Sequence, residues 1–459
     1  MRPHSLLLLF LIVAGLGAFV WFFERDLPST DERAELAKKV LPLEAEAVTA
    51  LSIERDGSVV RLEKVPATAG GDAAGAAQPT ETFGWRVVEP LEARADEDEI
   101  ADVLDSLTHL TKERTLDDIE PQELGLNSPT LTVRLSTSDE EWALQVGEEV
   151  PATSNVIMAV EGRDEAYVVS GDFREDLEKK PGEWRSRDAF PFERKAVTRV
   201  VLSAGGDEVV LRREGEDFRL EAPFSDEADE DKVSDLLDAL TGLEIDTFLD
   251  EPPPQPGLGL QPAVSVIRVG VGEEQDVEIR LGSRASDDEE LRYALVDGQV
   301  FLTETELGEL APSPASDWRS RGWTKLEVFA VEKLRLREGE SELVLERSGG
   351  DWLRGGDKIA YTTASDVLYA IGDTEARGIT TGESVKLEAP LLEFLLSSKD
   401  SEETLRLYTE PGGVYRGVRE GREAVLELSR ESVDELRAKI QVARDAEPLP
   451  SPIEEGDLE

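Results

Sequence analysis

The four-residue sequence Trp-Arg-Ser-Arg occurs twice in the chain, and its two copies mark a much longer internal repeat. They begin at Trp184 and Trp318, 134 residues apart. Earlier in the same units, 12 of 26 residues are identical between the stretches 85–110 and 218–243. This period is far longer than the roughly 20–50 residues of solenoid repeats. Each copy is long enough to enclose its own hydrophobic core, so the sequence predicts tandem domains.

A third, more divergent copy follows the second. The stretch from Val331 matches the stretch from Val197 at the same spacing, but the third copy has no Trp-Arg-Ser-Arg. A low-complexity insert at 66–82 lengthens one turn of the first copy and is expected to form a flexible loop. Residues 443–459 are acidic and contain proline, which is typical of a disordered tail. The predicted repeat domains are 42–189, 190–322 and 323–442.

Hydrophobic periodicity predicts the content of one repeat. Residues 48–55 and 59–65 alternate apolar and polar side chains, as half-buried strands do. Asp96 is expected to cap a helix that carries one apolar stripe, and a short helix is expected at 173–179. We therefore predict an α+β fold of mostly antiparallel sheets with helices packed on one face. The stripe residues of the first two copies are Ile100, Val103, Leu104, Leu107 and Leu110, and Val233, Leu236, Leu237, Leu240 and Leu243.

The first 23 residues are interpreted as a transmembrane signal anchor. Residues 6–23 are uncharged and mostly apolar, and as a helix they would reach about 27 Å, enough for a bilayer core. Trp21 and the two following phenylalanines resemble an aromatic anchor at the membrane interface. The small residues lie inside the apolar run rather than after it. This pattern favours an uncleaved anchor over a cleaved signal peptide.

The flanks of the apolar run predict its orientation. Arg2 precedes the run, so the N-terminus is expected in the cytoplasm and the bulk of the chain outside it. Residues 24–41 are expected to form a juxtamembrane linker helix. The predicted location is the bacterial inner membrane, crossed once, with the repeats in the periplasm or otherwise extracytoplasmic.

Composition excludes several classes of function. The chain has 100 acidic and 50 basic residues, a net charge of −50, which argues against nucleic acid as a partner. It has no cysteine and only two histidines, and His109 lies off the helix stripe, so it is interpreted as a surface residue. The sequence has no phosphate-binding loop, serine-hydrolase elbow or zinc-protease motif. We therefore expect no enzymatic activity, no cofactor and no metal.

Three acidic runs, 95–99, 225–231 and 286–290, could in principle bind Ca²⁺. None has the ligand spacing of a calcium-binding loop. The first two precede predicted helices, where carboxylates interact favourably with the positive end of the helix dipole. The third is interpreted as a solvated loop.

The Trp-Arg-Ser-Arg copies allow two interpretations. Arginine can bind a carboxylate or phosphate with two hydrogen bonds and can stack on tryptophan, so the copies could form a ligand-binding surface. Both copies also lie where one repeat ends and the next begins, which favours a structural seam between domains. The residues concerned are Trp184, Arg185, Arg187, Trp318, Arg319 and Arg321.

The order of these features resembles domain-of-unknown-function family 4340. The resemblance lies in the apolar segment followed by "ERDLPSTDERAELAKKVLPLEAEAVTALSIERDG", then "WRVVEP", an acidic helix start, "LGL" and a WR-x-R stretch. It implies a bacterial membrane-anchored envelope protein built from repeats, without known catalytic residues. It also implies a partnership with ABC-type transporter components like those linked to gliding motility.

The leading functional hypothesis is a non-enzymatic, membrane-anchored scaffold or accessory subunit of an envelope complex. Repetition suits extended binding surfaces. The alternatives are a periplasmic sensor that binds glycan or peptide at the Trp-Arg junctions, and a cell-wall hydrolase that uses paired carboxylates.

Overall fold

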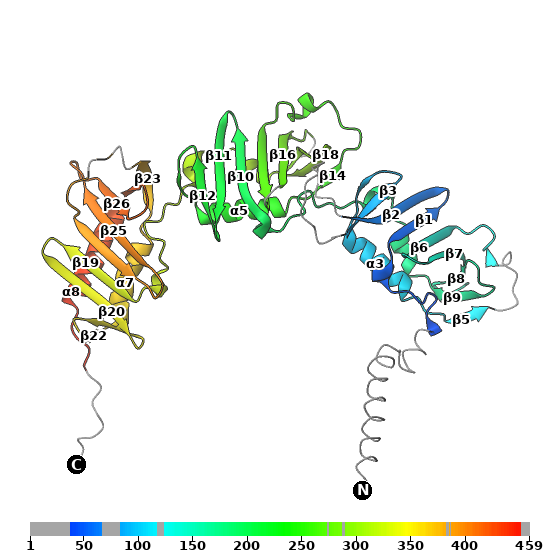
Figure 1. Ribbon diagram of the computed structural model, residues 1–459, viewed down its shortest axis with the longest axis horizontal. Helices are drawn as coiled ribbons and strands as arrows, with labels where there is room; N and C mark the ends of the chain where they lie inside the picture. Colours follow the sequence, from blue (N-terminus) through cyan, green and yellow to red (C-terminus); the bar gives the residue numbers. More distant parts are fainter. Residues whose placement is uncertain are drawn as a thin grey trace, which may run out of the picture. The chain divides into compact units, whose positions relative to one another are not determined.

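The structure contains three nine-stranded antiparallel sheets, each with helices packed against it (Figure 1). The chain divides into two compact units, of which Met1–Arg187 contains one sheet and Asp188–Glu459 contains two. Within the described residues no helix is long and apolar enough to cross a bilayer. The predicted membrane segment, most of the linker helix and all of the insert except Pro66 lie outside those residues. The computed structural model describes residues 37–66, 83–116, 124–272, 275–286, 290–381, 385 and 387–450.

The first sheet has the strand order β4-β3-β2-β1-β6-β7-β8-β9-β5, and every strand pair in it is antiparallel. This confirms the predicted antiparallel α+β class. Its strands are β1 (Ala50–Arg55), β2 (Ser58–Pro66), β3 (Phe83–Glu89), β4 (Ala93–Arg94), β5 (Arg114–Leu116), β6 (Leu131–Ser136), β7 (Glu141–Glu149), β8 (Asn155–Val160) and β9 (Ala166–Ser170). Its helices are η2 (Ala45–Ala47), α3 (Glu97–Thr108), α4 (Phe173–Leu177) and η4 (Pro181–Trp184).

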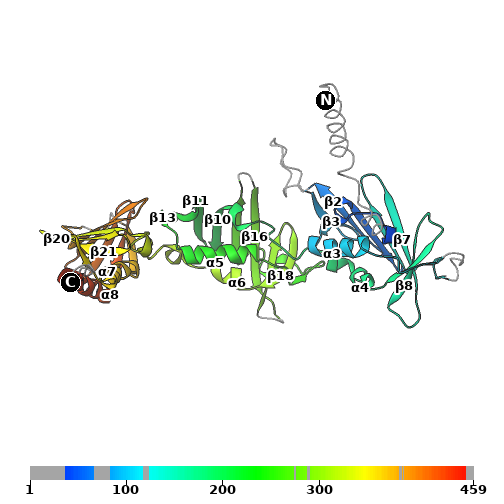
Figure 2. The ribbon, with the colours of Figure 1, turned by 90° about the horizontal axis from the view of Figure 1, so that it is seen from below.

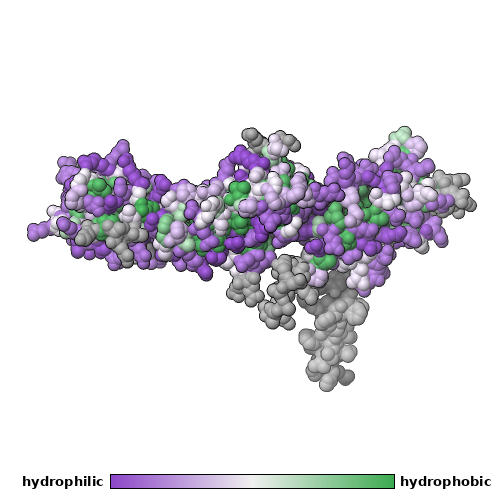
Figure 3. Space-filling view, turned by 90° about the horizontal axis from the view of Figure 1, so that it is seen from above, coloured by the Kyte–Doolittle hydropathy of each residue, from purple (hydrophilic) through white to green (hydrophobic). Residues whose placement is uncertain are grey.

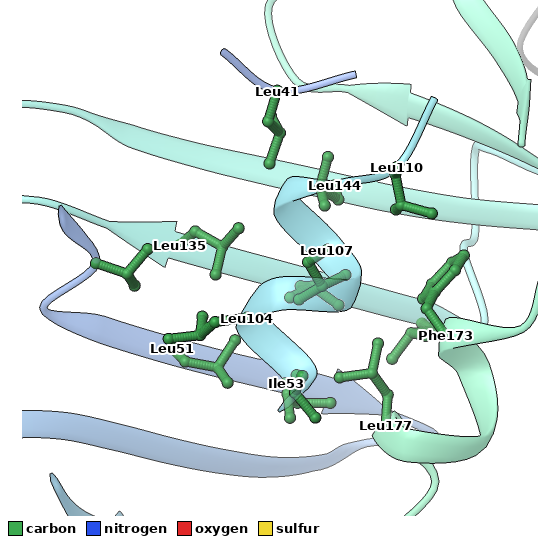
Figure 4. Packing of buried hydrophobic residues seen from close by; sticks show 14 of the residues in the cluster. Leu41, Leu51, Ile53, Leu104, Leu107, Leu110, Leu135, Leu144, Phe173 and Leu177 are labelled. Carbon is green, nitrogen blue, oxygen red and sulfur yellow. The ribbon is translucent and has the colours of Figure 1, made fainter. Parts of the chain in front are cut away.

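The core of the first unit lies between the sheet and α3. Asp96 caps α3 as predicted, because its carboxylate accepts a hydrogen bond of 3.2 Å from the N–H of Glu99. All five residues of the predicted stripe are buried. In Figure 4 Leu104 of α3 lies beside Leu51 of β1. Burying such a side chain contributes roughly 1.5–3 kcal/mol.

The first repeat begins before residue 42, the start predicted from the sequence. Val40 and Leu41 are fully buried in its core. The N–H of Val40 also donates to the carbonyl of Leu110, at 2.9 Å, after the end of α3. These residues therefore belong to the domain and not to the linker.

The second sheet repeats the same topology, and Figure 2 shows α5 and α6 on one face of it. Its strands are β10 (Val197–Ala204), β11 (Asp207–Glu214), β12 (Asp217–Ala222), β13 (Asp226–Glu227), β14 (Thr247–Phe248), β15 (Ser265–Val271), β16 (Gln275–Arg284), β17 (Leu291–Val296) and β18 (Gln299–Glu304). Its helices are η5 (Arg194–Ala196), α5 (Glu230–Thr241), η6 (Gln255–Leu258), α6 (Glu306–Leu310) and η7 (Ala315–Trp318).

The third sheet again has the same order. It differs in ending with a long helix, α8, which packs against α7. Its strands are β19 (Lys333–Glu338), β20 (Ser341–Ser348), β21 (Asp351–Arg354), β22 (Asp357–Ile359), β23 (Ala376–Thr381), β24 (Leu392–Ser397), β25 (Glu402–Thr409), β26 (Tyr415–Arg419) and β27 (Ala424–Leu428). Its helices are η8 (Val328–Ala330), α7 (Tyr361–Gly372) and α8 (Arg430–Asp445).

The chain after residue 442 is ordered further than the predicted tail allows. Helix α8 continues through Asp445, and Ala443 is fully buried. The N–H of Leu449 then donates to the carbonyl of Lys358 in β22, at 2.7 Å. The sequence could not indicate this pairing, because its partner lies on the edge of the third sheet. Residues 451–459 lie outside the described residues.

The repeated Leu-Gly-Leu sequence has a structural role in the first two repeats. Its leucines, among them Leu124 and Leu258, belong to small apolar clusters separate from the main cores. The central residues Gly125 and Gly259 have φ values of +72° and +69°, which side-chain-bearing residues rarely adopt. Glycine is therefore required at the centre of the motif.

Charged side chains pair across neighbouring strands of the sheets. Arg212 meets Glu221 at 2.7 Å in the second repeat, and Arg406 meets Glu393 at 2.8 Å in the third. These pairs are partly exposed to solvent, so each contributes less than about 1 kcal/mol to stability. Figure 3 shows the result on one face, where hydrophilic residues predominate and hydrophobic ones form small separate patches.

Candidate functional site

Each Trp-Arg-Ser-Arg copy extends the sheet edge of its own repeat. In the first repeat the carbonyl of Trp184 accepts from the N–H of Asp96, at 2.9 Å. In the second, the carbonyl of Trp318 accepts from the N–H of Asp229, also at 2.9 Å. A second bond two residues later completes a short antiparallel pairing in both repeats. In the third repeat, the bond from Leu449 provides a comparable pairing at β22.

Both tryptophans lie in equivalent surroundings inside their own cores. Trp184 and Trp318 have no exposed surface. An ammonium group lies over each ring: Lys179 at 5.7 Å from the Trp184 centroid and Lys232 at 4.8 Å from the Trp318 centroid. Because neither ring reaches solvent, neither can stack on a ligand at the surface.

The ammonium over the ring comes from a different element in each repeat. Lys179 follows α4 and pairs with Glu99 on α3. Lys232 lies on α5 and approaches Asp317 at 3.9 Å. Burial lowers the pKa of Lys232, and the carboxylates of Asp317 and Asp229 oppose this effect. The two repeats thus keep the lysine–tryptophan contact, although Lys232 occupies the position that Glu99 has in the first repeat.

The first arginine of each copy has different partners. Arg185 donates through Nε to the carbonyl of Gly182, at 3.3 Å. Arg319 donates through Nε to the Asp226 carboxylate, at 2.7 Å, and its guanidinium lies 4.5 Å from the centroid of the Phe224 ring.

The second arginines, Arg187 and Arg321, are exposed. The carbonyl of Arg321 accepts from the N–H of Ala376, at 2.9 Å, in the third repeat. The N–H of Ser320 donates to the carbonyl of Glu227 in the second repeat, at 3.0 Å, so a residue bonded to one repeat is followed directly by a residue bonded to the next.

Asp226 is the centre of a buried ion network between the second and third repeats. Its side chain is 1% exposed and accepts from Arg319 and from Arg422. Arg422 follows β26 and makes two bonds to Asp226, Nε to Oδ1 at 2.9 Å and Nη2 to Oδ2 at 3.1 Å. Arg422 also donates through Nη2 to the carbonyl of Ser320 at 2.6 Å and through Nη1 to the carbonyl of Gly322 at 3.0 Å.

A second ion group lies beside the first. Glu227 forms an ion pair with Arg419, whose Nε lies 3.5 Å from Glu403. Lys325 approaches Asp217 at 3.3 Å and Glu227 at 3.8 Å. Charged groups from β12, β13, β25 and β26 therefore meet at this junction. A polar cavity of about 360 Å³ adjoins it; its lining residues are Lys325, Leu326, Ser401, Glu402, Glu403, Thr404, Arg419 and Glu420.

The arginines keep Asp226 ionised despite its burial. Burial alone would raise the pKa of Asp226, but the hydrogen bonds and charge of Arg422, together with the hydrogen bond from Arg319, outweigh this effect and lower the pKa. Removing one partner from such a buried group is much more destabilising than removing a surface ion pair. The network is therefore the part of the junction most sensitive to substitution.

Sequence reasoning missed the central residues of this network. The helix-dipole interpretation of the run 225–231 is wrong for Asp226 and Glu227. They form β13, whereas the later acids of the run begin α5. The signal in the sequence is a difference between repeats: the positions of Asp226 and Glu227 are occupied in the first repeat by Ala93 and Arg94, which are not acidic.

The remaining predicted site residue is His109. Its ring nitrogen lies 3.0 Å from the Asp105 carboxylate on the exposed side of α3. Among the described residues no group of carboxylates and histidines is arranged to hold a metal ion.

These features define a tandem-repeat protein of α+β modules, in which modules two and three share a buried ionic junction. The sequence profile named Domain of unknown function (DUF4340) matches residues 85–262 and 255–391, and the chain belongs to this family. Each match runs from one repeat into the next.

No curated protein matches the chain significantly. Among solved structures, it shows a likeness to a DnaN sliding clamp (DNA polymerase III subunit beta) from Pseudomonas aeruginosa bound to griselimycin. Sequence identity is 9%, the match covers 85% of this chain and 92% of that one, and the TM-score is 0.14. A likeness this weak carries no argument about fold or function.

Proposed function

We propose that the chain is a non-enzymatic, membrane-anchored scaffold or accessory subunit of a bacterial envelope complex. The observation that carries this proposal is the junction around Asp226. Two complete modules, each with its own core, are held in a fixed relation by buried ion pairs. A fixed pair of modules can present two binding surfaces at a set distance, which is what a scaffold requires.

The apolar run at 6–23 supports a single-pass inner-membrane anchor, with the repeats outside the cytoplasm. The family resemblance supports a complex of the ABC-transport or gliding-related kind. The alternative of a sensor that binds ligand on exposed Trp-Arg junctions receives no support from the two buried indole rings.

The test is affinity purification of the tagged full-length chain from gently solubilised membranes. Native electrophoresis and mass spectrometry would follow. We expect a discrete assembly containing other envelope proteins in constant ratio. Recovery of the chain alone would contradict the proposal, and turnover of peptidoglycan or polysaccharide by the purified chain would favour the hydrolase alternative. Alkaline extraction and protease accessibility of intact cells test the anchor and its orientation separately.

A further inference from the structure

The third repeat exposes an aromatic patch that has no counterpart among the described residues of the other repeats. We define the aromatic patch as Val328 and Phe329 of η8 with Tyr361 and Tyr369 of α7. Phe329 is 72% exposed, Tyr369 55% and Tyr361 52%. Large side chains with this exposure are unusual in a chain whose surface is otherwise strongly charged.

Helix α7 carries the two exposed tyrosines and also contacts η8. Segment η8 packs against α7, and Val328 lies so close to Gly372 that an added Cβ there would come within 2.6 Å of Val328 Cγ2. Tyr361 and Tyr369 are eight residues apart, which places them about 12 Å from each other along the helix axis. The patch therefore extends over more than two helical turns.

Two of the corresponding positions in the second repeat hold charged residues that bind each other. Arg194 of η5 occupies the position of Val328 and donates to Asp238 at 2.6 Å and to Ser234 at 2.8 Å on α5. Asp238 in turn occupies the position of Tyr369. The fold thus tolerates an ion pair here, and the third repeat has aromatic and aliphatic groups instead.

Carboxylates border the patch. Glu327 and Glu332 flank η8 and Asp373 follows α7; all three are exposed. Their carboxylates make no ion pair among the described residues, whereas one nearby cation, Arg347, donates to the carbonyl of Phe329 at 3.3 Å. Aromatic side chains in the centre with charges at the rim are typical of protein interfaces.

We infer that the aromatic patch of the third repeat docks an amphipathic helix of a partner protein, with apolar residues against the aromatic side chains and lysine or arginine against the three carboxylates. The length of the patch along α7 suits helix-to-helix packing, and the acidic rim selects a basic partner. The inference rests on the proposed scaffold function and specifies the surface and the chemistry of its partner.

The test places a photo-crosslinking benzoylphenylalanine at Phe329 or Tyr369 of the full-length chain in the cells that produce it. The matched controls carry the same group at Lys195 or Asp238, the corresponding positions of the second repeat. We expect a discrete adduct from 329 and 369 only, whose crosslinked peptide contains apolar and basic residues. No adduct, an equal adduct from the controls, an acidic peptide, a lipid adduct or a second copy of this chain would overturn the inference.

A triple variant separates this inference from the scaffold proposal. Val328→Arg, Phe329→Lys and Tyr369→Asp introduce the residues that the second repeat already accommodates, and the crosslinker then replaces Tyr361. We expect at least a tenfold loss of adduct with an unchanged thermal midpoint, whereas retained adduct overturns the inference. If native purification recovers the same envelope partners in the same ratio with this variant as with the wild type, the docking surface lies elsewhere and the scaffold proposal stands. If neither chain recovers partners, both proposals fail.

Discussion

Arg422 and Asp226 are 196 residues apart in the sequence, yet they form a two-point ion pair in the interior of the protein. Arg422 belongs to the third repeat and Asp226 to the second. The pair is supported by Arg319, which approaches the same carboxylate from the segment that connects the two repeats. One carboxyl group thus binds arginines from the third repeat and from the connecting segment.

Replacing Asp226 by Asn should uncouple the second and third repeats. The substitution leaves Arg319 and Arg422 buried without a counter-charge, and the loss of a buried partner is worth about 3–5 kcal/mol. We expect scanning calorimetry to show a lower midpoint for these repeats. Glu278→Gln is the matched control, because Glu278 pairs with two arginines at the surface and its loss should be below about 1 kcal/mol. Equal effects of the two substitutions would contradict the central role of Asp226.

The stability difference between the wild type and Asp226→Asn should depend on pH with a defined sign. The pKa of Asp226 in the folded protein is below its ordinary value of 3.8. Its contribution to stability is therefore complete above that value and is lost as the pH falls through the lower, folded pKa. The difference in unfolding free energy between the wild type and Asp226→Asn should stay constant from neutral pH to about pH 5 and shrink below 3.8. Urea titrations of both proteins at several pH values provide the measurement, and a difference that already disappears near pH 6 would contradict it.

Gly308 and Arg292 form a coupled pair within the second repeat. A Cβ added to Gly308 would lie 2.0 Å from Nη1 of Arg292, so Gly308→Ala should destabilise the repeat by about 1–3 kcal/mol. Val156 occupies the position of Arg292 in the first repeat and is fully buried. Arg292 is itself buried with Nε and Nη1 unpartnered, so Arg292→Val should be neutral or stabilising.

The double variant of Gly308 and Arg292 completes this test. Valine leaves room for the new methyl group, so Gly308→Ala should have little effect in the Arg292→Val background. Denaturant midpoints of the four proteins give the interaction free energy. Additive effects would show that the two residues are independent.

Substitution of Trp184 or Trp318 should lower the stability of the repeat that contains it. Trp184→Ala and Trp318→Ala each remove a fully buried ring from a core, which is worth about 3–5 kcal/mol. Because the two surroundings are equivalent, we expect similar losses in the two repeats, measurable by thermal unfolding. A variant that unfolds like the wild type but loses a ligand would restore the binding interpretation.

Local patterns in the sequence were sufficient to predict the main strands and helices of a repeat. The alternation in residues 48–65, the cap at Asp96 and the apolar stripe of α3 all depend on neighbours within a few residues, and the structure confirms them. The Asp226 network could not be predicted in this way, because its members come from separate repeats and an acid close to a helix has an obvious local explanation.

The pairing of Leu449 with β22 in the third repeat could not be predicted from the sequence either. The edge of the third sheet is paired by a backbone N–H, that of Leu449, and this bond requires no particular side chain. Residues 446–450 therefore need not resemble Trp-Arg-Ser-Arg, and they do not. The aromatic patch was equally hard to recognise, because Tyr369 is unremarkable until Asp238 is known to be its counterpart.

The direct passage of the chain from one sheet edge to the next at Ser320 and Gly322 has a mechanical consequence. Only the backbone torsions around Arg321 are left to absorb a pull along the chain, so tension reaches both modules at once. In a force experiment the two should resist as one element, and the first event should be rupture of the arginine–carboxylate contacts between them rather than extension of a linker.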